Sequence, residues 1–560
     1  MVDHPVYEER QAEAATAGPA SAARLRVGWR EALLAVLLVG IIGFAAYLRF
    51  VGQNWDDFTH LHPDERFLTD VVSRLQPVSG IGEYFNTHAS GLNPNNRGFG
   101  FYVYGTLPLF VVKAASGVVA DLARDPAWAG YNGVHLVGRT VSALADLTTL
   151  FFIFLIGRRL YNRWVGLLAA ALYAGAVLPV QLSHFWTMDA PSTLPVVIAF
   201  WFAVRVLDEG GAGNYAGFGV ALGAAVASRI NVAPLAVVLA LAALIRVLPT
   251  FDVRYPRLKR QAMWAREGGG LLLAAALSFI VFRVAQPYAF SGPGIFGILP
   301  NMTWWQQMQT VRSQVSGQVD FPPNYQWTSR VPYVFSWWNM VMWGMGLPLG
   351  LTAWGAWLWA GWRVVRARPN WTRHLLPVVW VLLYYGWQGG GWVMSMRYYM
   401  PLYPFLILLA AWALVRLARR AWRGLAERPT GGARARLALT SGLLVMVTGF
   451  TLLWGFAFTR IYTRQLTRVQ ASHWFLQNVP ADYSFTIEAP DGSTHLVNLG
   501  LPNDRVTHEF EVMREATRYF QDGQTDSVPF TVPLAYNVAG LSVIVSTEPQ
   551  NVQMETLWLG

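Results

Sequence analysis

The sequence contains no cysteine, and charged residues make up only 13% of its 560 positions. The first absence excludes disulfide bonds and metal sites built from thiolates. The second sets the chain apart from soluble globular domains, in which about 25% of residues are charged. A deficit of this kind is expected where part of the protein surface faces lipid. We also find no glycine-rich nucleotide-binding loop and no internal repeat.

Hydrophobic residues make up 54% of the chain, which also has 26 tryptophans and 22 tyrosines. Such rings favour the membrane–water boundary, where one end of the side chain is apolar and the other is wet. The formal charge is +11. In a soluble protein this charge would favour binding of nucleic acid. Here arginines in cytoplasmic loops explain it, so we expect no nucleic-acid partner.

Apolar runs long enough to cross a bilayer recur along most of the chain. About 20 residues of α-helix span the hydrocarbon core. The pattern therefore predicts an all-α polytopic membrane protein with about eleven transmembrane helices. They are expected at 32–50, 136–157, 164–183, 190–207, 214–229, 232–248, 268–287, 336–362, 374–392, 398–416 and 438–459.

The run 101–122 is ambiguous, because Gly105, Pro108 and Lys113 interrupt it. If it does not cross, the arginine-rich loops 158–163, 254–266, 363–373 and 416–436 lie on the same side as the basic N-terminal segment. Basic loops strongly prefer the cytoplasm. We therefore expect 101–122 to be a helix on the outer interface of a plasma or inner membrane. The N-terminus is then cytoplasmic and the C-terminus outside.

This topology divides the chain into three parts. Residues 1–30 are expected to form a disordered cytoplasmic tail, and residues 31–460 the transmembrane domain. Two long outer loops belong to that domain, at 51–135, with interfacial helices, and at 288–335. Residues 461–560 are expected to form an extracytoplasmic domain that is first helical and then rich in β-strands. The strand-like runs are 483–488, 494–499, 530–534 and 541–546.

Two outer segments carry acidic residues where helices are expected to begin. Asp64 and Glu65 follow Pro63 in the first outer loop, and Asp189 precedes Pro191 at the start of the 190–207 helix. One explanation is structural, because acidic residues complement the dipole of a helix N-terminus or cap it. The other is functional, because two carboxylates at one level outside the membrane suit general acid–base catalysis or metal binding.

Three arginines lie at the same outer level. Arg139 is near the start of the second expected span, Arg229 follows Ala227-Ser228, and Arg397 precedes Tyr398. Each could be an interfacial anchor. Together they form a basic rim beside the carboxylates, and arginine binds phosphate with two parallel hydrogen bonds. A lipid-phosphate substrate requires this arrangement, with charge at the headgroup level and a hydrophobic groove below it.

These motifs resemble those of the GT-C glycosyltransferases that take sugar from a polyprenyl-phosphate carrier. The likeness is to the family-39 type, which includes protein O-mannosyltransferases and the aminoarabinose transferases of lipid A. It rests on the order of Pro63-Asp64-Glu65, Arg139, Asp189-Ala190-Pro191 and Arg397-Tyr398-Tyr399-Met400-Pro401. It covers about residues 30–460, which it implies are a GT-C catalytic domain.

The resemblance implies an inverting transfer of a sugar to an acceptor hydroxyl on the outer face of the membrane. Asp64 would be the general base, Glu65 would support it or contact the acceptor, and Asp189 would shape the site or bind a metal. Arg139, Arg229 and Arg397 would contact the donor phosphate. The expected partners are the polyprenyl-phosphate-linked sugar, a protein, lipid or glycan acceptor, and membrane lipid.

The sequence departs from the aminoarabinose transferases at one place. They have Glu-Lys-Pro before the interfacial helix of the first loop, whereas this chain has Tyr104-Gly105-Thr106-Leu107-Pro108. The missing Glu and Lys put in doubt a metal site and a donor contact of the family's kind. His62, His184 and Asp189 could rebuild a site for a divalent metal; solvated or hydrogen-bonded histidines are the alternative. No other cofactor is expected.

Two other functions fit parts of the sequence. A transporter or flippase for a lipid-linked sugar would use the same acids and arginines as a pathway, but it predicts charges deep in the spans and an internal repeat. A non-catalytic scaffold would use the C-terminal domain for interactions.

Overall fold

The computed structural model describes residues 29–319 and 321–478, together with four C-terminal strands at 484–488, 494–498, 527–531 and 541–544. The chain divides into two compact units, Met1–Asn54 with His60–Thr463 and Trp55–Thr59 with Arg464–Gly560. All but the last two residues of the predicted N-terminal tail, 1–30, lie outside the described residues.

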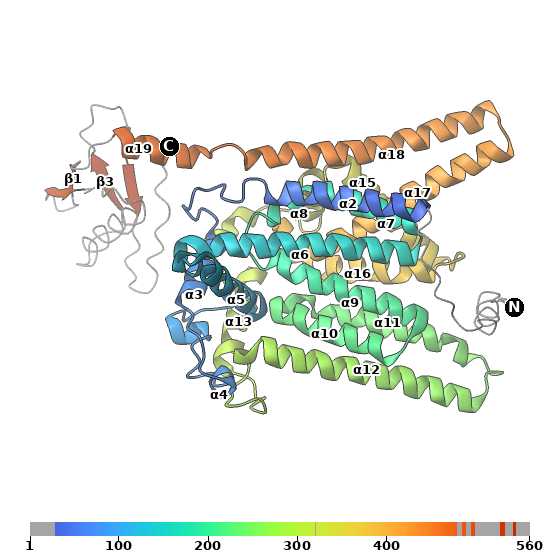
Figure 1. Cartoon of the computed structure of the whole chain (residues 1–560), viewed down its shortest axis with the longest axis horizontal. Helices are drawn as coiled ribbons and strands as arrows, with labels where there is room; N and C mark the ends of the chain where they lie inside the picture. Colours follow the sequence, from blue (N-terminus) through green and yellow to red (C-terminus); the bar gives the residue numbers. More distant parts are fainter. Residues whose placement is uncertain are drawn as a thin grey trace. The chain divides into compact units, whose positions relative to one another are not determined.

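The first unit is a bundle of long helices that run nearly parallel or antiparallel (Figure 1). Its α-helices are α2 (Trp29–Phe50), α3 (Pro63–Arg74), α4 (Ile81–Tyr84), α5 (Thr106–Ala123), α6 (Tyr131–Leu160), α7 (Arg163–Gly175), α8 (Val177–Leu182), α9 (Asp189–Glu209), α10 (Ala212–Ser228), α11 (Ala236–Val247), α12 (Arg257–Ala285), α13 (Met302–Ser316), α14 (Val334–Asn339), α15 (Leu347–Val365), α16 (Thr372–Gln388), α17 (Tyr403–Glu427) and α18 (Gly431–Phe458). Short 3-10 or π segments connect them at Pro94–Arg97 (η1), Pro126–Ala129 (η2), Ile230–Leu235 (η3), Leu248–Phe251 (η4), Pro287–Ala289 (η5), Pro322–Trp327 (η6), Met340–Gly344 (η7), Met396–Leu402 (η8) and Thr459–Ile461 (η9).

Eight helices of the described part are long and apolar enough to cross a membrane, as expected of a multi-pass membrane protein. They are Trp29–Phe50, Thr106–Ala123, Tyr131–Leu160, Asp189–Glu209, Ile230–Phe251, Arg257–Ala285, Met396–Glu427 and Gly431–Ile461. The predicted count of eleven is not confirmed. The run 164–183 is broken into α7 and α8 at Ala176, whose backbone is extended. Helices α10 and α16 have 17 residues each, slightly short of a full span.

Helix α5 corresponds to the ambiguous run 101–122. It has 18 residues and, by length and composition, could cross a membrane. Figure 1 shows it at one end of the bundle, at an angle to the long helices α6, α9 and α12. Its predicted position on the outer interface therefore stays a prediction.

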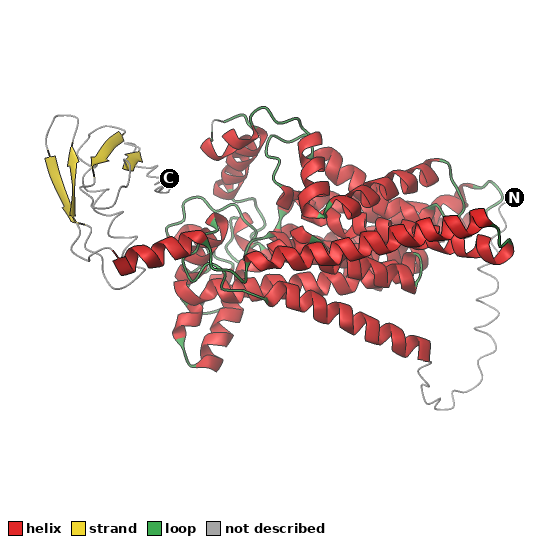
Figure 2. Cartoon of the chain, turned by 90° about the horizontal axis from the view of Figure 1, so that it is seen from above, coloured by secondary structure: helices red, strands yellow, loops and turns green. Residues whose placement is uncertain are grey.

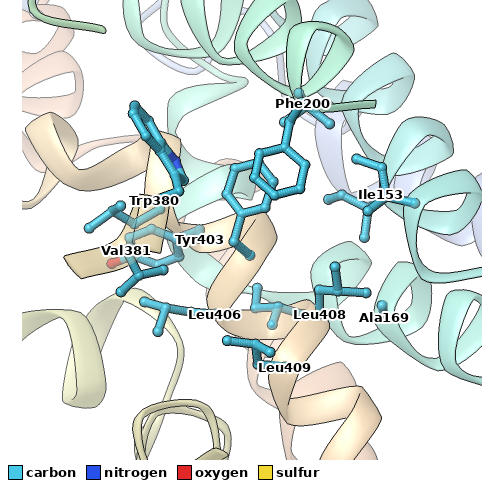
Figure 3. Packing of buried hydrophobic residues seen from close by; sticks show 14 of the residues in the cluster. Ile153, Ala169, Phe200, Trp380, Val381, Tyr403, Leu406, Leu408 and Leu409 are labelled. Carbon is cyan, nitrogen blue, oxygen red and sulfur yellow. The ribbon is translucent and has the colours of Figure 1, made fainter. Parts of the chain in front are cut away.

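Helix α17 forms the centre of the first unit. In the most apolar 18-residue stretch of the span Met396–Glu427, 83% of the residues are buried. The helix is apolar on all sides, as expected of a helix that other helices enclose. Figure 3 shows Tyr403 and Leu408 of α17 among Ile153 of α6, Phe200 of α9 and Trp380 of α16. The surrounding helices are thereby held in fixed positions, including those that carry the acidic residues.

The arginine-rich loops gather at one end of the bundle. Arg159 at the end of α6 pairs with Asp208 near the end of α9 at 2.8 Å. Arg163 at the start of α7 pairs with Glu31 at the start of α2, also at 2.8 Å. The turns α6–α7, α11–α12 and α17–α18 lie at this same end (Figure 1). This agrees with the assumption that the basic loops share one side of the membrane; which side that is stays a prediction.

The second unit contains α19 (Thr467–Asn478) and the strands β1 (Ser484–Glu488), β2 (Thr494–Asn498), β3 (Ser527–Thr531) and β4 (Leu541–Ile544). The strands form an antiparallel sheet in the order β2-β1-β3-β4, and β1 pairs Thr486 with Leu496 and Ile487 with Phe530. In the described part of the chain, strands occur only in this unit (Figure 2). They lie close to the four predicted runs, and a separate β-rich domain stays a prediction.

Candidate functional site

The first acidic segment begins a helix, as its sequence predicts. His62 is the N-cap of α3, and its Nδ1 accepts a hydrogen bond from the backbone N–H of Glu65 at 3.3 Å. Pro63 occupies the first helical position, where its fixed φ is already suited to a helix. Asp64 and Glu65 therefore occupy the first turn, and because they are consecutive they point in different directions.

Glu65 points into the protein and forms a buried ion pair with Arg139 of α6. Both side chains are fully buried, and Arg139 Nε donates to both carboxylate oxygens at 3.1 Å. Oε2 of Glu65 also accepts from the backbone N–H of Trp186 at 2.7 Å, and Arg139 Nη1 donates to the carbonyl of Gln53 at 2.6 Å. The predicted acceptor contact of Glu65 and phosphate contact of Arg139 do not fit this burial, because neither side chain reaches the surface.

Gly138 explains how Trp186 comes so close to this ion pair. A Cβ at position 138 would overlap the Trp186 indole, so the ring packs directly on the backbone of α6. This contact holds the turn before α9 against α6. Asp189, three residues after Trp186, is positioned by the same turn.

Asp64 remains partly exposed and pairs with Arg397. The carboxylate accepts a hydrogen bond from the guanidinium, and the side chains keep 23% and 28% of their surface exposed. The two residues are 333 positions apart in the sequence. Unlike the pair of Glu65 and Arg139, this pair is accessible to a ligand from outside the protein.

A second carboxylate–arginine pair joins Asp189 to Arg229. Arg229 Nη1 donates to Oδ1 of Asp189 at 2.5 Å, and the hydroxyl of Thr187 donates to Oδ2 at 2.9 Å. Asp189 is nearly buried, at 4% side-chain exposure, whereas Arg229 keeps 14%. Asp189 is the first residue of α9, and its carboxylate is directed to Arg229.

Tyr398 joins the pair of Asp64 and Arg397 to the more buried pair of Asp189 and Arg229. The guanidinium of Arg229 lies 4.9 Å from its ring centroid and that of Arg397 lies 5.4 Å from it. Cations at this distance from an aromatic ring are attracted to its negative face. We define the site cluster as Asp64, Asp189, Arg229, Arg397 and Tyr398.

The electrostatics show that both carboxylates of the site cluster act on the same neighbours. Burial lowers the pKa of His62, the carboxylates of Asp64 and Asp189 raise it, and Arg397 lowers it further. Burial also raises the pKa of the Tyr104 hydroxyl, and the same two carboxylates add to this effect. Tyr104 and His62 therefore both lie near Asp64 and Asp189.

Tyr104 is in the stretch where the sequence departs from the aminoarabinose transferases. The next residue, Gly105, packs so closely on the backbone of Ala227 and Ser228 that a Cβ would overlap it. Thr106 then donates from its backbone N–H to Oε1 of Gln286 at 2.6 Å. The stretch is thus fixed next to Arg229.

The metal site suggested by the sequence is not assembled. Nδ1 of His184 lies 2.8 Å from the carbonyl of Val180, and Nε2 lies 2.9 Å from that of Val51. Its ring stacks on Tyr462 at 3.7 Å between centroids. Within the described residues no group of three or more His, Asp or Glu could hold a metal ion. Whether the protein needs a metal stays untested.

Three residues beside the carboxylates received no role from the sequence: Tyr104, Thr187 and Tyr398. Tyr398 stood in the Arg397 motif, and Tyr104 stood in the departing stretch. For Tyr104 and Tyr398, the position within those motifs was the only signal in the sequence, because their contacts join segments that are far apart in the chain.

Comparison with known proteins agrees with the resemblance seen in the sequence. Residues 131–286 match a family described as dolichyl-phosphate-mannose-protein mannosyltransferase. This segment contains Arg139, Asp189 and Arg229. No curated protein matches the sequence.

Several solved structures are similar at low sequence identity. The apo oligosaccharyltransferase of Archaeoglobus fulgidus is 13% identical, with a TM-score of 0.48 over 82% of this chain and 59% of that one. This chain thus spans about three fifths of the archaeal protein. ArnT from Cupriavidus metallidurans bound to undecaprenyl phosphate is 16% identical, with a TM-score of 0.46 over 89% and 92%. The S. cerevisiae protein O-mannosyltransferase Pmt1–Pmt2 complex is 16% identical, with a TM-score of 0.33 over 46% and 35%.

The resemblance to protein O-mannosyltransferases is therefore confirmed over residues 131–286, the segment that matches the family.

Proposed function

We propose that this protein is an inverting glycosyltransferase that moves a sugar from a polyprenyl-phosphate carrier to an acceptor hydroxyl. The observation that carries the proposal is the site cluster, in which the accessible pair of Asp64 and Arg397 and the more buried pair of Asp189 and Arg229 meet around Tyr398. The matched family supports the choice of donor, because its description names dolichyl-phosphate-mannose, a sugar linked to a lipid phosphate.

The arginines of the site cluster are suited to the donor phosphate. A guanidinium carries five N–H donors, so Arg397 can bind a phosphate and still hold Asp64. Arg229 is held by Asp189, and its guanidinium lies 4.9 Å from the Tyr398 ring centroid. Two cations at one aromatic ring would bind the phosphate together, while the lipid chain stays in the membrane.

Asp64 is the proposed general base. In a single displacement the acceptor oxygen attacks the anomeric carbon and loses its proton to Asp64. The bond between that carbon and the phosphate oxygen breaks, the configuration inverts, and the phosphate leaves with the electron pair. Arg229 and Arg397 stabilise the charge that develops on it. Glu65 and Arg139 have a structural role in this proposal, and Asp189 orients Arg229.

We place the reaction on the outer face of the cell membrane. The site cluster lies on helix ends opposite to the arginine-rich turns, and basic loops prefer the cytoplasm. The lipid carrier brings its sugar already activated, so no nucleotide is needed at that face. A protein, lipid or glycan could supply the hydroxyl.

The test uses the full chain in nanodiscs with a panel of polyprenyl-phosphate hexoses and follows release of polyprenyl phosphate. General-base catalysis contributes roughly 10²–10⁴ in rate, so Asp64→Asn should lower kcat by about that factor while donor binding survives. The matched control is Asp70→Asn, which changes another partly exposed carboxylate of α3, 32% exposed and paired with Arg74. Full turnover by Asp64→Asn would place the active site elsewhere.

Donor binding is tested separately with Arg397→Ala. Loss of a charge-assisted contact to phosphate should weaken binding of the polyprenyl-phosphate donor by about tenfold or more. Arg74→Ala, at a side chain that is 56% exposed, serves as the control and should bind normally. If Arg397→Ala leaves both KM for the donor and kcat unchanged, the assignment of the phosphate contact is wrong.

A further inference from the structure

A groove between α2, α7, α17 and α18 lies away from the site cluster. Its volume is about 470 Å³, and its walls include Ile41 of α2, Leu168 and Ala171 of α7, and Leu444 of α18. These walls are apolar. The groove therefore resembles a space for a hydrocarbon chain more than a space for a sugar or a nucleotide.

One end of the groove differs from the rest. Trp164 and Arg419 also line it, and Trp164 is the second residue of α7. Ala171 is seven residues further along α7, which is about 10 Å deeper at 1.5 Å per residue. Arg419 Nη2 donates to the side-chain oxygen of Asn162, just before α7. The groove is thus polar at the start of α7 and apolar towards its middle.

The polar end belongs to the arginine-rich end of the bundle. Arg163 lies beside Trp164, and Arg420 and Arg423 follow Arg419 on α17. Arg163 is paired with Glu31. Arg419, by contrast, has no carboxylate partner among the described residues, so its charge is available at the end of the groove.

Helices α2 and α18, which form the outer walls of the groove, have mostly exposed side chains. Only 17% of the residues are buried in the most apolar 18-residue stretch of α2, and only 11% are buried in the corresponding stretch of the span that contains α18. Both helices are candidate membrane spans. A groove between them opens towards lipid, and a cationic residue together with a tryptophan at its end is the arrangement expected at the headgroup level.

We propose that this groove binds one anionic membrane phospholipid. An acyl chain would occupy the apolar part along Leu168, Ala171 and Leu444. The phosphate would accept hydrogen bonds from the Arg419 guanidinium, whose planar group can donate to two phosphate oxygens in parallel. Trp164 would lie at the level of the glycerol. The site does not depend on the glycosyltransferase proposal, because it shares no residue with the site cluster.

Native mass spectrometry of the purified full chain tests the proposal with phosphatidylglycerol, phosphatidylcholine and undecaprenyl phosphate. We expect one phosphatidylglycerol to bind at least tenfold more tightly than phosphatidylcholine. Arg419→Gln removes the charge and Ala171→Leu fills the groove, and each should abolish that preference or weaken binding tenfold. Arg420→Gln, which changes the adjacent exposed arginine outside the groove lining, is the matched control and should bind normally.

Three results would overturn the proposal. Equal binding of the two phospholipids would show that no phosphate-specific contact exists. Equal loss in Arg420→Gln and Arg419→Gln would show general attraction to a basic surface. Tighter binding of undecaprenyl phosphate, abolished by Ala171→Leu, would show that the groove holds the carrier lipid instead. The midpoint of thermal unfolding of each variant without lipid shows whether the variant is folded. Arg419→Gln and Ala171→Leu change different parts of the groove, so each one tests the proposal without the other.

Discussion

The buried pair of Glu65 and Arg139 gives the sharpest prediction, because it separates structural from catalytic residues within one dipeptide. Glu65→Gln keeps the size of the side chain and removes its charge. The amide retains one acceptor oxygen where the carboxylate had two, and it turns an N–H₂ group towards a guanidinium that also carries only donors. Arg139 then remains buried and loses the negative charge of Glu65.

The expected cost follows from burial. Both side chains of the pair are fully buried, and breaking such a pair by removing one charge costs about 3–5 kcal/mol. Asp64→Asn breaks a pair whose side chains are 23% and 28% exposed, and such pairs contribute only about 0–1 kcal/mol. Neighbouring substitutions should therefore have opposite profiles: Glu65→Gln loses stability, and Asp64→Asn loses turnover.

The assay measures unfolding by SDS titration in bicelles and turnover on the same samples. The double variant Glu65→Gln/Arg139→Gln removes both charges and should recover part of the stability, with a coupling of about 0.5–3 kcal/mol. The opposite result is a free energy of unfolding for Glu65→Gln within about 1 kcal/mol of the wild type, roughly the spread of a surface substitution, together with a strong fall in kcat. Glu65 would then act on the substrate.

Three further predictions concern Tyr398, His62 and the membrane topology. Tyr398→Phe keeps the ring that contacts Arg229 and Arg397 and should bind the donor within about threefold of the wild type. Tyr398→Leu should bind the donor about tenfold more weakly in a donor titration, since each of the two contacts is worth about 0.5–1 kcal/mol; equal binding by both variants would show that the ring has no role in donor binding. Burial lowers the pKa of His62 below 6.5, so the unfolded chain binds a proton more readily, and stability should fall as the pH drops below about 6.5. His62→Asn, which retains a capping oxygen, should flatten that dependence in thermal unfolding, and an unchanged profile would assign it to other groups. A reporter fused after Gly560 should prove extracytoplasmic, and cytoplasmic activity would invert the topology.

Much of the helical architecture was predictable, because a long apolar run in a membrane protein has few conformations other than a helix that pair its backbone groups. The runs at 32–50, 190–207 and 438–459 became α2, α9 and α18 with ends shifted by a few residues. Hydropathy predicts one helix for the run 164–183, but the structure breaks it at Ala176. Its side chains are apolar on both sides of the break, so hydropathy alone could not locate it, although Pro179 was a local signal.

The candidate site was predictable in its members and not in its pairings. Asp64 and Arg397 were both chosen from local motifs, but nothing local states that residues 333 positions apart form an ion pair. The burial of Glu65 had a signal. It lies three and seven residues before Leu68 and Val72, and this spacing places it on the buried face of α3. The acidic character of Glu65, by contrast, favours an exposed position.

Arg49, near the end of α2, forms hydrogen bonds at the break between α7 and α8. Its Nε donates to Asp146 at 2.6 Å, and Nη1 donates to the carbonyl of Ala174 at 3.0 Å, just before the break. The hydroxyl of Tyr173 donates to the other oxygen of Asp146, at 2.6 Å. Arg49 thus satisfies a helix end that would otherwise lack partners.

This connection constrains how the protein is made. Helix α2 leaves the ribosome about a hundred residues before Asp146 does, so it must enter the membrane while Arg49 still lacks its partner. An arginine alone in hydrocarbon is costly, and Arg49, the second-to-last residue of α2, can wait at the nearby interface. Its bonds to Asp146 and Ala174 form only once α6 and α7 are present. The buried position of the end of α2 therefore depends on helices that are synthesised after it.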